Sequence, residues 1–473
     1  ALPIFLGNVK GKCVANQLSQ NKPSMFGLTL FESIQFKVLQ MIESIISIHE
    51  TEISSEQEFI DFAKKVGIIH RSNELLTSSE FYETKKFNTM FSIDGIEWWF
   101  NEMFGLHTCS SISNKQKDPI YCFDYTDLAD IEVRKGYSRL GGVIEMKLIN
   151  GRLMFHRLNG SSTPSKDQIR LALTSSLASM TIKYHALYLH YLTSNNINYH
   201  LLKIDIKTSC IKRLLSPITV EPFGVNEIGV FTLLTRGGFP RIFNLSKKGM
   251  NAYWTKSSKS FDLRKTLDIT KTFPDTRDTT FNVSLFKSSP IQREMCMWWN
   301  VISYHCSDFI NNSLINEPDE TYADIERFLS IIRTNYPNTI IQYHSNLDPM
   351  ANKQYNIVRN TIEICTMLLF TGVAHETVSN PTMFKSFGNP FIMSSTLRND
   401  DKGLSKEIDG IKWMSVLAAT SMPSFLLANN NADVGIDKDE KKLFTKFSND
   451  LFNLDIPKTS ILHPSNVESS VRW

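Results

Sequence analysis

The sequence predicts a mainly helical fold with a few short β-hairpins. Gly and Pro, 21 and 17 of 473 residues, make up about 8% of the chain, against roughly 12% in an average protein, which disfavours a loop-rich or sandwich fold. Apolar residues recur at helical spacing over long stretches, and a strand signal with a two-residue turn occurs at 143–158. The length alone allows about three domains, but one large helical domain is the simplest interpretation.

Six stretches have helical patterns. Residues 31–49 carry apolar side chains along one face, and Ser55 with Glu58 forms a capping box that opens a helix ending at Lys65. From Pro164 onward helices dominate, and the expected ranges are 167–193, 293–315, 323–334 and 355–380. The Asn380-Pro381 step should end the last of these, because the residue before proline is pushed out of the helical region.

The hairpin signal is an alternation of apolar and polar residues on both sides of a turn. Asn150-Gly151 is a typical two-residue hairpin turn, and the alternating apolar positions around it are Ile144, Met146, Leu148, Leu153 and Phe155. The polar stretch 429–442 (NNNADVGIDKDEKK) is expected to be a surface loop.

Composition and charge exclude several classes of function. A formal net charge of +3 without a dense Lys/Arg patch does not suggest nucleic-acid binding. The longest apolar run, 362–374, contains Glu363 and is shorter than the roughly 20 residues of a membrane span, so we expect a core helix and no transmembrane segment. Seven cysteines without CxxC spacing indicate neither a disulfide framework nor a zinc ribbon. The compartment stays open between secreted and cytoplasmic.

Two histidines on the predicted helix 167–193 are candidate metal ligands. His185 and His190 are five residues apart, which on a regular α-helix turns them about 140° away from each other. They can share a metal only if the helix contains a π-bulge, and such bulges cluster at functional sites. The pair alone is a weak signal, since histidines on an apolar helix are more often core or surface residues.

A third histidine lies in the most apolar predicted helix. Burying the imidazole of His375 is costly unless it finds a partner, which is either a backbone carbonyl or a metal. Ser379, one turn farther, could offer an oxygen ligand from the same face. The neighbouring Glu376 does not make a zincin motif, because HExxH would require histidine at 379.

Together with three further segments, these histidines resemble the catalytic domain of lipoxygenases. The family pattern has HxxxxH on a bulged helix, then a Leu-Leu-x-Pro segment, an I-N-x-x-[AG] stretch and a carboxyl-terminal tail. This chain has Leu214-Leu215-Ser216-Pro217, Val225-Asn226-Glu227-Ile228-Gly229 and the tail PSNVESSVRW at 464–473. The resemblance covers about residues 115–473 discontinuously. It implies one lipoxygenase-like helical catalytic domain, with a helical part at 1–115 and a metal-binding core at 116–473, and without an amino-terminal lipid-binding β-barrel.

The resemblance implies a dioxygenase with one non-heme iron or manganese ion. Its ligands would be His185, His190, His375, Ser379 and the terminal carboxylate of Trp473, with Asn380 as a substitute for Ser379. No catalytic group is expected beyond the metal-bound water. The expected reaction inserts O2 into a polyunsaturated fatty acid and gives a lipid hydroperoxide.

The resemblance also places three residues along the substrate and oxygen channel. Gly229 matches a position where small residues influence the site and face of oxygenation, with an R-type product expected for glycine. Leu233 and Phe231 could line the same channel, although plain core packing explains them equally well.

The chain departs from the family pattern at several positions. Trp473 replaces the usual terminal Ile or Val, Thr382 replaces a glutamine, and Val230 replaces an arginine. These changes leave two alternatives open. One is a lipoxygenase-fold enzyme with another task, such as hydroperoxide isomerisation or oxidation of a different apolar substrate. The other is an inactive scaffold that binds lipid or a partner protein. Any membrane association would be weak.

Overall fold

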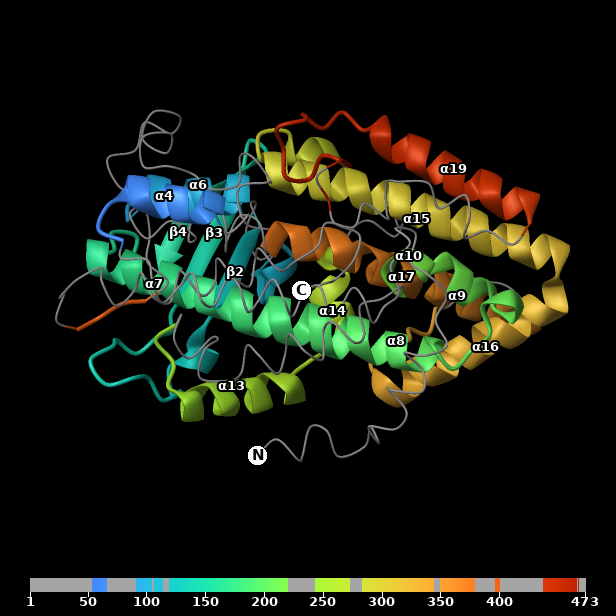
Figure 1. Cartoon of the computed structure of the whole chain (residues 1–473), viewed down its shortest axis with the longest axis horizontal. Coiled ribbons are helices and arrows are strands. Elements are labelled where there is room, and N and C mark those ends of the chain that lie inside the picture. Colours follow the sequence, from blue (N-terminus) through green and yellow to red (C-terminus); the bar gives the residue numbers. More distant parts are fainter. Residues whose placement is uncertain are drawn as a thin grey trace.

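The computed structural model describes residues 53–65, 91–103, 106–113, 119–219, 243–272, 283–343, 349–378, 396–399, 437–465 and 467. These residues form long helices packed beside one small antiparallel sheet (Figure 1). The prediction of a mainly helical fold with a short β-hairpin is therefore confirmed. The predicted helix at 31–49 lies outside the described residues.

The sheet has four strands in the order β1-β2-β3-β4, and every neighbouring pair is antiparallel. Its central element is the predicted hairpin, whose turn residues Asn150 and Gly151 have φ angles of 53° and 79°. Both values match a type I′ turn, which needs positive φ at both central positions. The strands are β1 (Ser111–Ser113), β2 (Ile120–Asp124), β3 (Val143–Ile149) and β4 (Arg152–Leu158). Strand β1 lies before residue 115 and pairs with β2, which lies after it. The sheet therefore spans the boundary that was expected between a helical part at 1–115 and a metal-binding core at 116–473.

The outer edge of β4 is covered by a helical segment. Asn101 accepts a hydrogen bond from the Leu153 N–H at 2.9 Å and donates to its carbonyl at 2.7 Å. Glu97 accepts another from the Phe155 N–H at 2.9 Å. These side chains come from α6 (Ile93–Trp98) and the π-helical turn η2 (Trp99–Met103). The contacts satisfy backbone groups that an open edge strand would leave to solvent or to another chain.

The predicted helix 167–193 is confirmed as part of one continuous helical run. It consists of α7 (Lys166–Ala178), the π-helix η5 (Ser179–Asn195) and α8 (Asn196–Leu201). The run starts with a capping box, in which the Ser165 hydroxyl accepts from the Gln168 N–H and the Gln168 side chain accepts from the Ser165 N–H. This arrangement satisfies two of the free N–H groups at the helix start.

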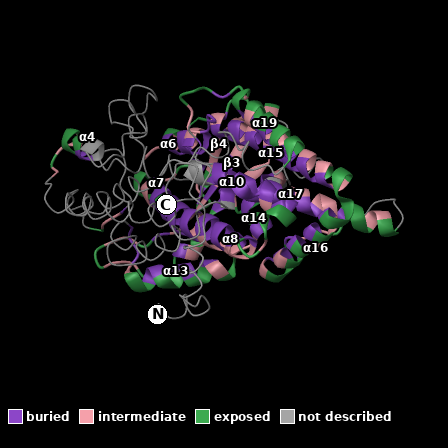
Figure 2. Ribbon diagram, turned by 45° about the vertical axis from the view of Figure 1, so that its right-hand side comes forward, coloured by how far each residue is buried: buried purple, intermediate pink, exposed green. Residues whose placement is uncertain are grey.

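A second layer of helices surrounds α17 (Pro349–Val378), which packs against α15 (Pro290–Asn316), α16 (Pro318–Asn335) and η5. Its middle is buried on every side, from Ile364 to Phe370 (Figure 2). Among the described helices, α17 is long and apolar enough to cross a membrane by length and composition, yet 78% of its apolar window is buried in the protein. The prediction of a core helix at 362–374 is therefore confirmed.

The remaining helices are shorter than α15, α16 and α17. They include α4 (Glu56–Lys65), where Ser55 and Glu58 form the predicted capping box. The others are α9 (Cys210–Leu214), α10 (Ser216–Thr219), α13 (Lys247–Lys259), α14 (Leu263–Leu267) and α19 (Lys438–Phe452). Single 3₁₀ turns lie at Leu106–Thr108, Thr126–Leu128, Ile206–Thr208, Ile269–Thr272 and Val283–Phe286.

The prediction of a surface loop at 429–442 is wrong for its carboxyl-terminal end, residues 438–442. Residues 438–442 form the first turn of α19, because the Asp437 side chain accepts from the N–H groups of Asp439 and Glu440. An N-cap aspartate of this kind starts a helix even in a polar stretch. The helix predicted at 355–380 also begins earlier, at Pro349, and its expected end at Asn380 lies outside the described residues.

Helix α13 depends on one glycine where it meets the loop at Glu132. A Cβ atom added at Gly249 would lie 1.9 Å from the Glu132 carbonyl oxygen. Gly249→Ala should therefore push α13 away from this loop and lower the free energy of unfolding by about 1–3 kcal/mol. Thermal unfolding measures the change, with Asn251→Ala on the exposed face of α13 as the control. A midpoint unchanged by Gly249→Ala would contradict the close approach.

A buried histidine joins α15 to α19. The ring of His305 stacks on Phe447 with centroids 4.2 Å apart and also contacts Phe309 and Phe444. Burial is the largest cause that lowers the pKa of His305 from 6.5 to about 3. The nearby Asp308 raises this pKa by a smaller amount, and Lys446 lowers it. The folded protein therefore resists protonation of this ring more than the unfolded chain does.

This histidine should make stability depend on pH. The pKa of His305 is lower in the folded than in the unfolded protein. The contribution of this residue to the free energy of unfolding is therefore complete above pH 6.5 and is lost as the pH falls towards 3. From pH 7.5 to pH 5 we expect a loss of about 2 kcal/mol from this residue. Urea unfolding of the unaltered chain and of His305→Phe at both pH values measures it, because phenylalanine cannot titrate. An equal pH dependence in both chains would contradict the prediction.

Candidate metal centre

The predicted distortion of the histidine helix is confirmed. Residues Ser179–Asn195 form a π-helix, and the rings of His185 and His190 lie with their centroids 4.6 Å apart at 70° to each other. On a regular α-helix the same residues would point about 140° apart. The wider turn therefore brings both imidazoles to one face of the helix.

Both imidazoles lie in the protein interior. His185 and His190 have 1% and 0% of their surface exposed, and the Nε2 atom of each is buried. Their neighbours along the helix, Ala186, Leu187 and Leu189, are buried as well. Burial favours the neutral form of an imidazole, which is the form that binds metals.

The opposite face of η5 is fixed by polar contacts to α13 and to the 3₁₀ turn at 126–128. Tyr253 donates to the Ser179 hydroxyl at 3.1 Å, and Tyr188 donates to the Ser257 carbonyl at 3.2 Å. Lys183 forms an ion pair with Asp127 at 2.6 Å, with both side chains mostly buried. These contacts hold the helix from outside and so orient the histidine face inward.

A further contact supports the carboxyl-terminal end of the π-helix. The Tyr336 hydroxyl donates to the Leu192 carbonyl at 2.6 Å and accepts from the Asn196 amide at 3.0 Å. A π-helix has poorer packing than an α-helix and is rarely this long, so external support of its carbonyls is expected at a functional distortion.

Helix α17, which carries the third histidine, packs against η5. Thr193 and Ser194 of η5 line a small enclosed space together with Leu368 and Thr371 of α17. The two helices run antiparallel (Figure 1), so positions before Ser194 lie level with positions after Thr371. His375 lies on α17 four residues after Thr371, and its side chain is outside those described.

The other expected site residues fall outside the described part of the chain. These are Ser379, Asn380 and Trp473 among the ligands, Gly229, Phe231 and Leu233 along the channel, and the departures Val230 and Thr382. Within the described side chains, no group of three or more His, Cys, Asp or Glu could hold a metal. The Leu214-Leu215-Ser216-Pro217 segment is described, and its α10 part packs against α17.

The described residues fit the role of metal ligands. Two buried imidazoles converge from one distorted helix, and nitrogen donors of this kind suit a first-row transition metal. A bulged helix also explains why the histidines are five residues apart rather than three or four.

Sequence reasoning missed the polar supports around the site. Glu363, noted only as a charge within an apolar run, forms ion pairs with Arg264 at 2.9 Å and Arg359 at 3.0 Å and accepts from Tyr343. Arg359 lies four residues before Glu363 on the same helix, whereas Arg264 and Tyr343 come from separate segments, so local spacing could have predicted only the pair with Arg359. On η5, Tyr188 between the two histidines was a usable signal, because its hydroxyl donates to the Ser257 carbonyl on α13 and so marks the face turned towards that helix.

Comparison with solved structures places this architecture among the lipoxygenase-like folds. A fungal lipoxygenase from Fusarium graminearum is similar with a TM-score of 0.59 at 14% identity, over 96% of this chain and 92% of that one. A 9R-lipoxygenase from Cyanothece is similar with a TM-score of 0.58 at 11% identity, over 93% and 71%. A deletion variant of a lipoxygenase gives 0.60 at 14%, over 93% and 74%. No protein-family model and no curated protein matches the chain.

The chain thus has a lipoxygenase-like fold, as the residues around His185 and His190 predicted. At identities of 11–14% this likeness concerns the fold alone.

Proposed function

We propose that this chain is a non-heme metal dioxygenase that inserts O2 into a polyunsaturated fatty acid and forms a lipid hydroperoxide. The observation that carries the proposal is the π-helical turn that brings His185 and His190 together in the interior of a lipoxygenase-like fold. A seventeen-residue π-helix around two buried histidines supports this proposal, because π-helices are rare, occur mostly as single turns and are frequent at functional sites.

The proposed ligands are His185, His190 and His375, with Ser379 or Asn380 and the carboxylate of Trp473. When bound, iron or manganese would supply the one-electron chemistry that removes a hydrogen from the acyl chain. The contribution of the chain is to keep the imidazoles neutral by burial and to fix their orientation through the contacts of Tyr188, Lys183 and Tyr336. The apolar surroundings exclude water from the reacting chain.

Gly229, Phe231 and Leu233 are proposed to line the channel for the acyl chain and O2. The resemblance to lipoxygenases supports an R-configured product, because Gly229 matches a position where small residues influence the site and face of oxygenation.

The decisive experiment incubates the purified, metal-loaded chain with linoleic or arachidonic acid. We expect oxygen uptake and a matching rise in conjugated-diene absorbance. No diene from either acid, despite a filled metal site, would overturn the proposal.

Two alternatives give different results in the same assay series. An isomerase on this fold would consume a supplied lipid hydroperoxide without taking up oxygen. An inactive scaffold would do neither and would hold no stoichiometric metal. The changes at Thr382 and Val230 motivate both alternatives.

A further inference from the structure

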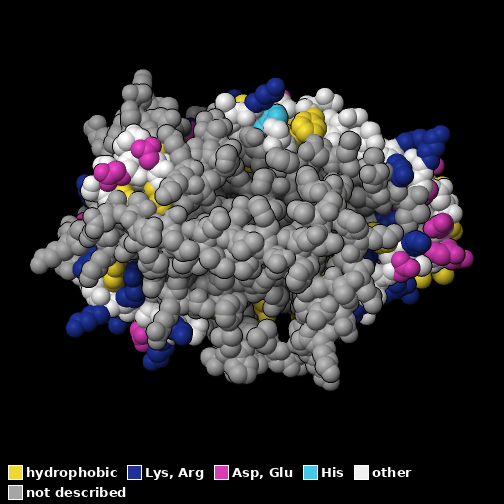
Figure 3. Space-filling model, viewed as in Figure 1, with side chains coloured by type: hydrophobic (Ala, Val, Ile, Leu, Met, Phe, Trp, Pro, Cys, Tyr) yellow, Lys and Arg dark blue, Asp and Glu magenta, His cyan; other side chains and the backbone are white. Residues whose placement is uncertain are grey.

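The exposed side of α13 carries four lysines, with Lys248 and Lys259 in its middle and Lys247 and Lys256 on its two margins. This helix buries Gly249, Met250, Tyr253, Trp254 and Ser257 against the protein. Its exposed positions include Lys247, Lys248, Lys256 and Lys259, and the helix contains no acidic residue. Lys and Arg side chains are visible along the lower left of Figure 3, where α13 lies in Figure 1.

Helix stability does not explain this arrangement. Lys256 and Lys259 lie in the last turn, where cations interact favourably with the helix dipole. Lys247 and Lys248 lie in the first turn, where the dipole favours acidic side chains. A helix selected only for stability would carry acidic residues there.

Few negative charges offset these lysines. Lys248 faces Glu132 at 3.5 Å in a largely exposed pair, which contributes little. Lys256 donates to the backbone carbonyl of Asp127, whose carboxylate is already paired with Lys183. Among the described residues, Lys247 and Lys259 form no ion pair.

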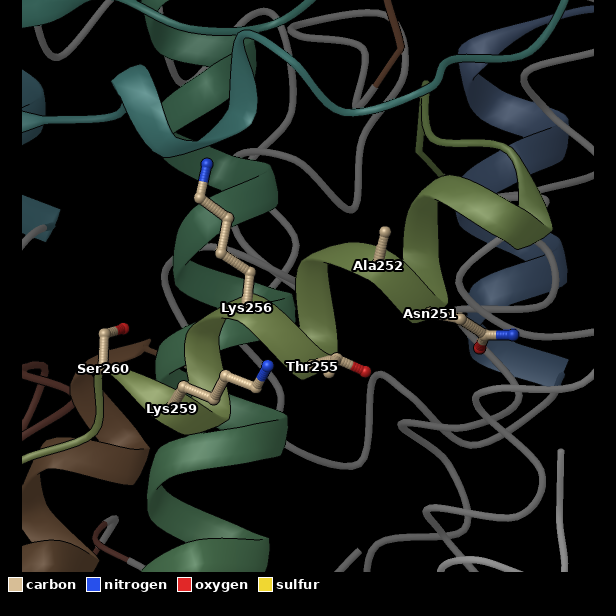
Figure 4. A pocket seen from close by; sticks show the side chains of 6 residues that line it. All are labelled: Asn251, Ala252, Thr255, Lys256, Lys259 and Ser260. Atoms are coloured by element: carbon tan, nitrogen blue, oxygen red, sulfur yellow. The ribbon is translucent and has the colours of Figure 1, made fainter.

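The face also contains an open hollow of about 670 Å³ near the end of the helix. Figure 4 shows its lining, which combines ammonium, hydroxyl and amide donors from a single element. The lining residues are Asn251, Ala252, Thr255, Lys256, Lys259 and Ser260. Lys256 and Ser260 already donate to the carbonyls of Asp127 and Ser257, so Asn251, Thr255 and Lys259 are the lining residues that can donate to the oxygens of a phosphate group.

We propose that this face of α13 docks the protein on an anionic phospholipid bilayer. The hollow receives one phosphate-bearing headgroup, and Lys247 and Lys248, about two turns away along the helix, face neighbouring headgroups. Because Ala252 is the apolar residue among the lining positions, the contact is electrostatic and does not depend on insertion of apolar side chains. This interaction lies beyond the proposed oxidation and does not require turnover.

The test is sedimentation with vesicles of phosphatidylserine and phosphatidylcholine, using the full chain. The double variant Lys247→Glu/Lys259→Glu should reduce vesicle binding roughly tenfold or more, since each lysine near an anionic surface contributes measurably. The matched control is Lys438→Glu/Lys441→Glu, which makes the same charge change on exposed positions of α19. We expect the control to bind like the unaltered chain, and circular dichroism shows that each variant is folded.

Several outcomes would overturn the proposal. One is equal binding to pure phosphatidylcholine vesicles, and another is equal loss in both double variants, which would reflect net charge alone. Displacement by inorganic phosphate at an ionic strength where chloride has no effect would assign the hollow to a free anion. Binding of polyglutamate but not of vesicles would assign the face to an acidic protein. Because the readout is binding, a negative result leaves the proposed dioxygenase activity untouched.

Discussion

His190→Ala should empty the metal site and reduce diene formation to background. The ring centroids of the two imidazoles lie 4.6 Å apart on one side of η5, so this variant removes one of the proposed metal ligands from the interior. Loss of one protein ligand costs a metal site most of its affinity, and oxidation without the metal has no alternative path. Metal analysis and the diene assay on the same preparation measure both effects.

The control for this variant is His156→Ala. His156 lies on β4, away from η5, and is only half-buried. We expect this variant to retain its metal and its activity. Full metal content in His190→Ala would mean that the buried pair is structural rather than ligating.

Arg213→Ala should destabilise the protein by about 3–5 kcal/mol. The guanidinium of Arg213 binds the Glu440 carboxylate through Nε at 2.8 and 3.0 Å and through Nη2 at 2.8 Å. Both side chains are almost completely buried, and Nη1 donates to the carbonyls of Ile206 and Lys207. Without the arginine, α19 would bury a carboxylate that has lost its counter-charge.

A double substitution separates the cost of a lone charge from the value of the pair. Arg213→Met/Glu440→Leu removes both charges together, and we expect much of the stability to return. Urea unfolding of Arg213→Met, Glu440→Leu, the double variant and the unaltered chain forms a complete double-mutant cycle. If the double variant is as unstable as Arg213→Ala, the pair itself, rather than the buried charge, stabilises α19.

Much of the architecture followed from local patterns. The hairpin at Asn150-Gly151, the capping box at Ser55 and the long helix at 167–193 were predicted because turn chemistry, capping and periodicity act over a few residues. The start of α19 was missed, since one N-cap, Asp437, decided between loop and helix in a uniformly polar stretch. The start of α17 at Pro349 was missed because its first turns carry no apolar repeat.

The site was predictable to a smaller extent. The five-residue spacing of His185 and His190 required a π-bulge, and the structure contains one. The contacts that hold it come from distant segments, as with Tyr336 and Leu192, 144 positions apart in the chain. Such pairings depend on the tertiary fold and leave no trace in local spacing. The lysine face of α13 was also not predicted. The net charge of +3 gives no information about how the charges are distributed over the surface.

The most direct test of the proposed metal centre is the metal content of the purified chain by mass spectrometry. We expect one iron or manganese ion per chain, and its loss in His190→Ala but not in His156→Ala. A chain that holds neither metal after anaerobic loading with Fe(II) or Mn(II) would contradict the proposed metal centre, and with it the dioxygenase function.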